Sequence, residues 1–333
     1  MKAYVIDRYA SQPAVRLAEL PEPDVAAGEV LVRIHAAGVN QLDHKIAQGE
    51  FKLILPYRLP LVLGNDLAGV VVRVGAGVHA FQPGDEVYAR PRKDRIGTFA
   101  EFLTVHQDDL AIKPANLSME EAASLPLVAL TAWQALVERA NLRHGQKVLI
   151  QAGSGGVGTI AIQLAQHLGA TVATTAGARN ADFLKELGAD VVIDYRTQDF
   201  STVLKDYDVV LDSQGPRSVA KSMTILKPGG TVIGIAGPPD PDFAREIGGN
   251  PVLKIATRLL SLKTRRQAAR LGVSYSFLFM QASGEQLGEI TKLVESGTIR
   301  PVVDRVFPFA DTPQALDHMA KGSTRGKIVI SMI

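Results

Sequence analysis

Val148-Leu-Ile-Gln-Ala-Gly-Ser-Gly-Gly-Val-Gly158 joins an aliphatic segment, typical of a buried strand, to the apolar run from Thr159 to Leu168, typical of a helix. Its glycines have the spacing G-x-G-x-x-G. In a strand–turn–helix, these glycines allow a tight turn, close approach of the backbone to a pyrophosphate, and close helix–strand packing. The N–H groups and dipole at the helix start also favour an anion. The pattern predicts a dinucleotide site made by Gly153, Ser154, Gly155, Gly156, Val157 and Gly158.

The same turn allows two other interpretations. Ala152 to Gly156 nearly matches the G-x-S-x-G turn that exposes a nucleophilic serine, here Ser154. Asp304 and His318 follow in the chain order of hydrolases. The glycines could also be purely structural. Gly158 and the strands after it suit a dinucleotide better, so hydrolysis remains an alternative.

The composition excludes several classes of protein. The 333 residues allow one large or two ordinary domains, and a formal net charge of +2 argues against a nucleic-acid partner. The chain has no cysteine, which excludes disulfides, thiolate nucleophiles and cysteine-ligated zinc. Met1 to Ile6 looks like a strand rather than a signal peptide, and no window approaches the ~18 apolar residues of a membrane span. We therefore expect a cytoplasmic protein.

The pattern of secondary structure changes near Lys147. Before it, short strands alternate with Gly and Pro turns, as in a β-rich barrel-like domain. After it, short apolar strands alternate with helices, which predicts an α/β fold with a doubly wound parallel sheet. We expect a β-rich domain of residues 1–122 and 283–333 and a Rossmann domain of residues 123–282. The expected strands include residues 30–36, 67–74, 86–89, 171–176, 191–195, 209–213, 231–236, 273–280 and 327–331.

Residues 238–272 form an insertion in the second domain. After a proline-rich start we expect one basic helix, and no Asp or Glu occurs from Ile247 to Gly284. A solvated amphipathic face explains this composition most simply; contact of residues 254–270 with an anionic substrate, a cofactor phosphate or a membrane surface is the alternative. The basic residues are Lys254, Arg258, Lys263, Arg265, Arg266 and Arg270.

The residues after the second expected strand of the Rossmann domain indicate which dinucleotide binds. A site for NAD has Asp or Glu about 20 residues past the first glycine. Here Thr174-Thr-Ala-Gly-Ala-Arg-Asn180 has no acid. Thr175 and Arg179 are the candidate contacts, and Arg179, helped by Arg196, could pair with a 2′-phosphate. We therefore predict NADPH.

Motifs along nearly the whole chain resemble the medium-chain dehydrogenase/reductase superfamily, and within it the zinc-independent quinone oxidoreductases. The insertion is similar to that of their mitochondrial and chloroplast-envelope members. The resemblance implies a GroES-like catalytic domain beside the Rossmann domain, and a homodimer. The motifs are Ala36-Ala-Gly-Val-Asn-Gln-Leu-Asp43, Gly64-Asn-Asp-Leu-Ala-Gly-Val-Val-Val72, Gly75-Ala-Gly-Val78, Phe81-Gln-Pro-Gly-Asp-Glu-Val87, Gly97-Thr-Phe-Ala-Glu101, Ala152 to Gly158 and Gly326-Lys-Ile-Val329.

One departure from the superfamily bears on the reaction. Zinc-dependent members have a cysteine at Asn40 and Gly-His-Glu at Gly64-Asn65-Asp66. Amides do not replace thiolate and imidazole ligands, so we expect no metal. Without zinc, the hydride acceptor must spread the incoming charge itself, as a quinone or an α,β-unsaturated carbonyl does. The predicted function is NADPH-dependent reduction of such a compound; reduction of an enoyl thioester and NADPH binding without turnover are the alternatives.

The resemblance also implies roles for individual residues. Asn40 would orient a carbonyl or the nicotinamide ribose, Asp43 would order the loop around it, and Tyr57 would be a cleft tyrosine. Tyr195 and Lys327 would lie toward the adenosine phosphate and the ribose. Further cofactor contacts would come from Thr131, Ser213, Ala236, Gly237, Phe277 and Phe279.

Overall fold

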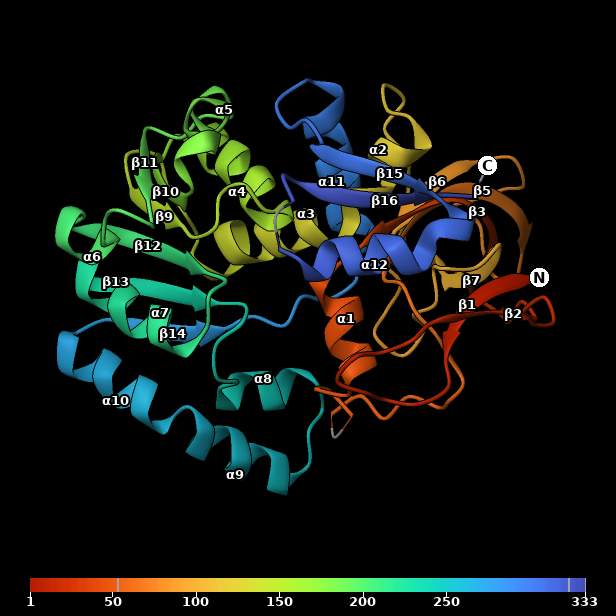
Figure 1. The fold of residues 1–333 in the computed structure, drawn as a ribbon, viewed down its shortest axis with the longest axis horizontal. Coiled ribbons are helices and arrows are strands. Elements are labelled where there is room, and N and C mark those ends of the chain that lie inside the picture. Colours follow the sequence, from red (N-terminus) through yellow and green to blue (C-terminus); the bar gives the residue numbers. More distant parts are fainter. Residues whose placement is uncertain (53, 323, 333) are drawn as a thin grey trace. The chain divides into compact units, whose positions relative to one another are not determined.

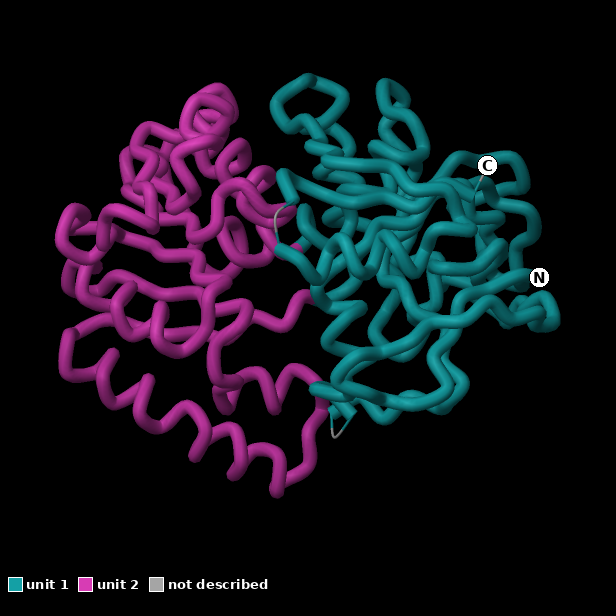
Figure 2. The backbone as a smooth tube through the Cα atoms, in the orientation of Figure 1, with its two compact units in different colours: residues 1–130, 281–333 teal, residues 131–280 magenta. Residues whose placement is uncertain are grey.

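The computed structural model describes residues 1–52, 54–322 and 324–332, which form two compact units (Figure 2). Unit 1 contains Met1–Leu130 and Gln281–Ile333, and unit 2 contains Thr131–Met280. The chain therefore leaves unit 1, builds the whole of unit 2 and returns. Helix α3 (Pro126–Trp133) contains the first crossing and continues as the π-helical segment η2 (Gln134–Arg139).

Unit 2 is built on a parallel sheet with the strand order β11-β10-β9-β12-β13-β14 (Figure 1). The chain thus adds strands outward from β9 on one side and then outward from β12 on the other, which is the doubly wound order. All six residues of β12 are buried, as expected for a strand covered on both faces. The strands are β9 (Lys147–Ile150), β10 (Thr171–Ala176), β11 (Val191–Asp194), β12 (Tyr207–Asp212), β13 (Leu226–Gly234) and β14 (Ser274–Phe277).

Helices cover this sheet and enclose its apolar core. Helix α4 packs on β9 and β10, and α7 packs on β12 and β13. Leu149, Val210 and Val232 lie within the core and are almost completely buried. The helices are α4 (Gly156–His167), α5 (Ala181–Glu186), α6 (Phe200–Val203), α7 (Pro216–Ser222), α8 (Pro241–Glu246), α9 (Pro251–Leu260) and α10 (Leu262–Leu271), with 3-10 turns η3 (Ala178–Asn180) and η4 (Met223–Ile225).

The prediction of one basic helix in the insertion is wrong, because the segment forms three helices. Asp240 and Asn250 cap the starts of α8 and α9, and each accepts a backbone N–H with its side chain. Gly248, at φ +68°, lies between these two helices. Ser261 ends α9 and precedes α10, and its hydroxyl donates back to the carbonyl of Thr257. The caps and the left-handed glycine therefore separate α8 from α9, and the break at Ser261 divides the basic segment into α9 and α10.

Unit 1 is β-rich, as predicted, and its strands form two sheets. One has the order β2-β1-β4, and the other the order β15-β16-β3-β5-β6-β8, with β7 paired to β3. The strands are β1 (Lys2–Ile6), β2 (Arg16–Glu19), β3 (Glu29–Val39), β4 (Leu61–Val62), β5 (Asp66–Val74), β6 (Glu86–Ala89), β7 (Phe102–His106), β8 (Leu110–Ile112), β15 (Val303–Pro308) and β16 (Lys327–Ser331). The helices are α1 (Gln41–Gln48), α2 (Met119–Ala123), α11 (Gly284–Glu295) and α12 (Thr312–Ala320), with 3-10 turns η1 (Gln107–Asp109) and η5 (Phe309–Asp311).

Strand β3 organises unit 1, because it pairs with β16, β5 and β7. Nine of its eleven residues are buried. Its end brings residues from the two parts of unit 1 together, since Val39 lies opposite Ile328 and Gly38 lies opposite Asp66.

None of the helices in the described ranges has the length and apolar composition of a membrane span.

Candidate functional site

The glycine turn lies between β9 and α4, beside the point where the strand order of unit 2 reverses. A Cβ on Gly153 would lie 2.1 Å from Thr174 Oγ1, and one on Gly158 would lie 2.5 Å from the carbonyl oxygen of Ala152. Both positions therefore require glycine for packing within the protein. A Cβ on Gly155 would meet only Ala152 O at 3.4 Å, an ordinary contact. The protein's own packing does not exclude a side chain at Gly155, whereas close approach of a pyrophosphate would.

The start of α4 supplies the donors for such a group. Gly155 is the N-cap, and no side chain caps the helix. The first N–H groups of a helix have no acceptor within it, so those of Gly156, Val157 and Gly158 point out of the helix end. The twelve-residue helix has no acidic residue in its first turn to compete with an anion. These residues fit the pyrophosphate of a dinucleotide.

Thr175, predicted to contact the cofactor, supports the turn itself. Its hydroxyl accepts the N–H of Ala152 at 3.0 Å and contacts Gln151 Oε1 at 3.2 Å. Its carbonyl accepts the N–H of Gly153 at 3.0 Å. Ala152 has φ +54°, so three local contacts hold an unusual backbone conformation in place.

Two arginines lie at the end of β10, where the adenosine ribose of a dinucleotide is expected. Arg179 is exposed in the 3-10 turn that follows the strand. A Cβ on Gly177 would lie 3.8 Å from Arg196 Nη1, so that guanidinium lies against the end of the strand. Arg196 also lies over the ring of Tyr195, with 5.6 Å between Cζ and the ring centroid, and Tyr195 is 60% exposed. The region offers positive charge and an aromatic surface.

The other strand ends of unit 2 bring further predicted residues together. Ser213 Oγ contacts the carbonyl oxygen of Gln151 at 3.5 Å, so the end of β12 lies beside the glycine turn. Gly237 requires glycine, because a Cβ there would lie 2.3 Å from the hydroxyl oxygen of Tyr275. Ala236 is half-buried.

The two predicted phenylalanines belong to an aromatic cluster with the insertion. Phe277 and Phe279 pack edge-on against Phe243 of α8, with ring centroids 5.2 and 5.5 Å apart. Phe277 is buried and Phe279 half-buried. Thr131, in α3, is 5% exposed.

Unit 1 contains a buried cluster of five polar residues around the end of β3, which we call the polar cluster: Asn40, Asp43, Asn65, Asp66 and Lys327. Each is 5% exposed or less. Asp66 accepts from the amide of Asn40 at 2.8 Å and from the ammonium of Lys327 at 3.1 Å. Lys327 also donates to Asn40 Oδ1 at 2.5 Å, and Asn65 donates to Asp43 at 2.7 Å. Asn40 and Asn65 are the positions at which zinc-dependent relatives were expected to carry ligands.

Two members of the polar cluster have little capacity left for other partners. The amide of Asn40 donates to Gly38 O and to Asp66, which uses both of its hydrogens, so only its oxygen can accept a further donor. The ammonium of Lys327 donates to Val39 O, Asn40 and Asp66, which uses all three of its hydrogens. Lys327 therefore stabilises the cluster, and the ribose contact that the resemblance implies stays a prediction.

Asp43 holds the loop between β3 and α1. Its carboxylate accepts the N–H of Asn40, the residue before α1, at 2.7 Å. Complete burial raises the pKa of Asp43 to about 7, against the lowering effect of its hydrogen bonds from Asn65 and Asn40 and of the charge on Lys327. The carboxyl also lines a cavity of about 390 Å³ within unit 1, with Leu63 and Leu316.

Tyr57 has its hydroxyl engaged within unit 1. The hydroxyl donates to the carbonyl oxygen of Lys93 at 2.7 Å. Burial raises the pKa of Tyr57 to about 12, so the phenol is a weaker acid than usual. In this conformation, Tyr57 has no hydrogen available for a substrate carbonyl.

Arg90, which the sequence did not single out, lies close to the polar cluster. It is 2% exposed, and within the part of the chain that the structure describes its Nε has no hydrogen-bond partner. Burial lowers the pKa of Arg90, while Tyr57 and the carboxylates of Asp66 and Asp109 raise it. A buried guanidinium with an unused donor is rare and provides a positive field. In the sequence, the feature that could have indicated Arg90 is its position directly after the strand β6.

Among the described residues, no hydrogen bond joins Ser154 to a base, as the hydrolase interpretation requires. His318 and Asp304 contact each other at 3.5 Å, but both lie in unit 1, whereas Ser154 is in unit 2. Ser154 has no hydrogen-bond partner among the described residues. No group of three or more His, Cys, Asp or Glu residues in ranges 1–52, 54–322 and 324–332 could hold a metal ion.

Three features together define a dinucleotide-binding protein: the strand order of unit 2, the free space beside Gly155, and the start of α4 without a side-chain cap. Comparison with known proteins makes this assignment specific. Residues 26–115 match the alcohol dehydrogenase GroES-like domain family, and residues 187–330 match the zinc-binding dehydrogenase family.

Three similar proteins match at least 99% of the chain. It is 35% identical to the mitochondrial NAD(P)H oxidoreductase RTN4IP1 of Mus musculus, over 100% of this chain and 89% of that protein. It is 33% identical to the chloroplastic NADPH-dependent alkenal/one oxidoreductase of Arabidopsis thaliana, over 99% of this chain and 79% of that protein. The solved quinone oxidoreductase from Coxiella burnetii has a TM-score of 0.87 and 31% identity, over 100% of this chain and 99% of that chain. The chain belongs to the medium-chain dehydrogenase/reductase superfamily and to its quinone oxidoreductase-like members, which confirms the predicted family and fold class.

Proposed function

We propose that this protein is an NADPH-dependent oxidoreductase that reduces a quinone or an α,β-unsaturated carbonyl compound. The observation that carries the proposal is Gly155, where the protein's own packing leaves room for a side chain and a bound pyrophosphate would account for its absence. The names of the similar proteins, which include NAD(P)H, alkenal/one and quinone oxidoreductases, support the same class of reaction.

The residues of unit 2 would bind and select the cofactor. The N–H groups at the start of α4 would hold its pyrophosphate, and Arg179 and Arg196 would attract the 2′-phosphate that distinguishes NADPH from NADH. No Asp or Glu that would repel this phosphate occupies residues 177–181, directly after β10. Bound NADPH supplies a hydride to the acceptor.

The residues of unit 1 would orient the reacting groups and provide positive charge near the acceptor. The remaining lone pair of Asn40 suits a hydroxyl donor, which favours the ribose role over orientation of a carbonyl. The guanidinium of Arg90 provides positive charge near the polar cluster, where it would favour an acceptor that becomes negative. Since Tyr57 is a weak acid with its hydrogen already donated, we assign the proton that completes the reduction to water.

The reaction is tested by following NADPH absorbance with a small quinone, an α,β-unsaturated aldehyde and an enoyl thioester, with a chelator present. We expect oxidation with the quinone or the aldehyde and no effect of the chelator. Oxidation of NADPH with the enoyl thioester alone would instead identify acyl thioesters as the substrate class. NADPH binding without oxidation of any of the three would contradict the proposed reaction, and a rate abolished by the chelator would contradict the zinc-free mechanism.

We also propose a homodimer and a cytoplasmic location. Strand β14 is at one end of the unit 2 sheet, and an edge strand can pair with that of a second copy. Light scattering would test the dimer, because one chain has a mass of 35.7 kDa. Some similar proteins are named as mitochondrial or chloroplastic, so cell fractionation is the test of location.

A further inference from the structure

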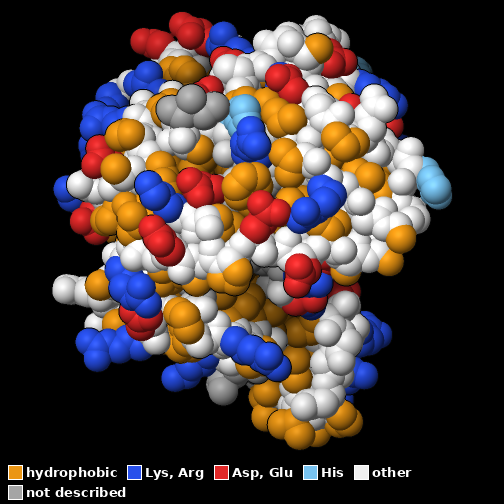
Figure 3. All heavy atoms as spheres, turned by 90° about the vertical axis from the view of Figure 1, so that its right-hand side faces the viewer, with side chains coloured by type: hydrophobic (Ala, Val, Ile, Leu, Met, Phe, Trp, Pro, Cys, Tyr) orange, Lys and Arg blue, Asp and Glu red, His pale blue; other side chains and the backbone are white. Residues whose placement is uncertain are grey.

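Helix α9 exposes an unusual amount of apolar surface. Among the described residues, the four most exposed large apolar side chains all belong to it: Leu259 at 66%, Leu260 at 62%, Ile255 at 61% and Val252 at 73%. Val252, Ile255 and Leu259 are spaced i, i+3 and i+7 and therefore share one face of the helix. Figure 3 shows apolar side chains gathered at the lower end of the molecule, at the height where Figure 1 draws α9.

The charged side chains of α9 and α10 themselves are all basic. Residues 247–284 contain six Lys or Arg and no Asp or Glu. The acids closest in sequence to α9 are Glu246 and Asp242, and each is already paired, with Arg139 and Arg245 respectively. In the described part of the chain, none of the six basic residues of α9 and α10 makes an ion pair. Their charge is therefore available to an external anion.

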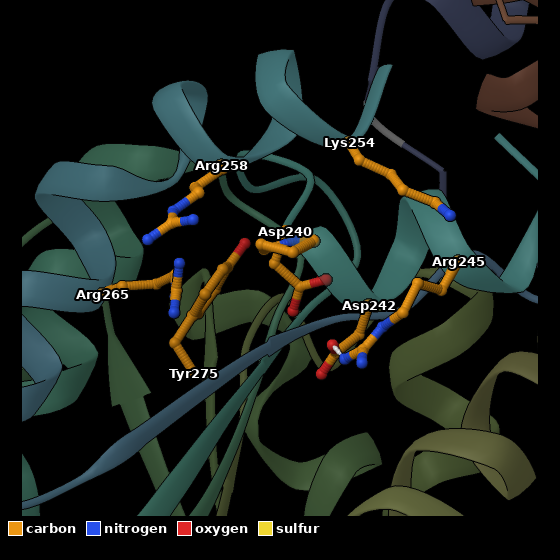
Figure 4. A pocket seen from close by; sticks show the side chains of 8 residues that line it. Asp240, Asp242, Arg245, Lys254, Arg258, Arg265 and Tyr275 are labelled. Atoms are coloured by element: carbon orange, nitrogen blue, oxygen red, sulfur yellow. Dashed lines mark hydrogen bonds and ion pairs between the residues drawn. The ribbon is translucent and has the colours of Figure 1, made fainter. Parts of the chain in front are cut away.

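Three of the basic side chains line a cavity of about 320 Å³ between α8, α9, α10 and β14. Figure 4 shows Arg258 and Arg265, from neighbouring helices, directed toward the same space above Tyr275, whereas Lys254 extends toward Arg245. Two guanidinium groups repel each other unless an anion lies between them. The carboxylate of Asp240 also lines the cavity, but it accepts the N–H groups of Phe243 and Phe277.

We propose that α9 and α10 form a membrane-docking surface that binds the face of a bilayer rich in anionic lipid. In this arrangement α9 lies flat, its apolar side chains enter the acyl region, and the basic residues contact headgroup phosphates. The cavity between Arg258 and Arg265 accepts one phosphate. The inference does not depend on the proposed reaction, because it rests on the exposed side chains of α9 and α10 and not on the glycine turn.

The composition of the exposed face favours a bilayer over a protein groove. Its four large side chains are Val, Ile and two Leu, with no aromatic residue. Leu and Val are under-represented among the residues that dominate protein interfaces, where Trp and Tyr are enriched. A row of aliphatic side chains beside unpaired cations, with no acid, is typical of an interfacial helix.

The test is sedimentation of the full-length protein with vesicles of neutral lipid and with vesicles that contain about 30% phosphatidylglycerol. We expect binding only to the anionic vesicles, lost in about 1 M salt, where the Debye length is about 3 Å. Leu259→Asp should weaken binding about 30-fold. Arg258→Ser combined with Arg265→Ser should weaken it about 25-fold, since each cation contributes about five-fold.

The matched control is Leu17→Asp, which places the same charge at a 48% exposed leucine in unit 1. It should bind vesicles like the wild type, and all variants should keep the wild-type melting temperature. Absence of wild-type binding, or equal binding by Leu259→Asp, would overturn the proposal. Binding of inorganic pyrophosphate through Arg258 and Arg265 without any vesicle binding would also overturn it. The same holds if the wild type forms an oligomer that does not bind vesicles and that Leu259→Asp dissociates.

Discussion

The glycine turn of unit 2 and the polar cluster of unit 1 are each made of a few residues, but they are assembled in opposite ways. The glycine turn is one continuous segment, and its chemistry follows from local backbone geometry. The polar cluster joins residues almost 300 positions apart in the chain, such as Asn40 and Lys327, and it depends on the complete fold of unit 1. Damage to the turn should therefore affect the ligand most, whereas damage to the cluster should affect folding most.

The largest effect is expected for Lys327→Met. This change leaves the carboxylate of Asp66 buried without its cation and removes a donor from Asn40. Breaking a buried pair costs about 3–5 kcal/mol of unfolding free energy, measurable by urea denaturation. Lys2→Met, at an exposed lysine of the same unit, is the control. The double variant Lys327→Met/Asp66→Asn should lose less than Lys327→Met alone; a loss below about 1 kcal/mol for the single variant would show that the cluster does not hold unit 1 together.

The polar cluster should also make stability depend on pH through Asp43. Its pKa rises from 3.8 to about 7 on folding, so the folded state binds a proton that the unfolded state releases. The free energy of unfolding should therefore fall as pH rises from 4 to 7, by about 1 kcal/mol per pH unit. Asp43→Asn should flatten this slope, whereas Asp24→Asn, at an exposed carboxylate, should keep it. An identical slope in wild type and Asp43→Asn would exclude Asp43 as the group responsible.

The contrast between turn and cluster also explains what the sequence could predict. The bounds of β6, β10 and β16 were predicted correctly because hydrophobic runs and flanking turns define them locally. The dinucleotide turn was recognised for the same reason. The contacts of Lys327 and Arg90 could not be predicted, because no spacing in the chain brings β16 or β6 to the end of β3. The three-helix insertion was misread, since periodicity shows a helical face but not its interruptions.

Within the glycine turn, Gly158→Ala should be the most damaging change. Its Cβ would lie 2.5 Å from Ala152 O and 2.6 Å from Gly153 Cα, so the helix must move from the strand. We expect a loss of about 1–3 kcal/mol of stability together with loss of NADPH binding. Gly288→Ala, in α11 with open space around its Cβ, should be neutral or stabilising. Equal stability of Gly158→Ala and wild type would contradict the packing role.

A smaller effect is expected at the end of β10. Arg196→Ser removes a guanidinium beside Gly177 and should weaken NADPH binding about ten-fold without changing NADH binding. Arg73→Ser, at an exposed arginine of unit 1, is the control. An equal loss for both nucleotides would place Arg196 outside the 2′-phosphate site.

The most direct test of the account is calorimetric titration of NADPH into the wild type and Gly155→Ala. The added methyl group has room in the protein, so stability should fall by less than about 1 kcal/mol. The account predicts binding by the wild type and at least about ten-fold weaker binding by Gly155→Ala, because the methyl group would occupy the approach of the pyrophosphate. Equal affinity of the two proteins for NADPH would contradict the assignment of the glycine turn as the cofactor site.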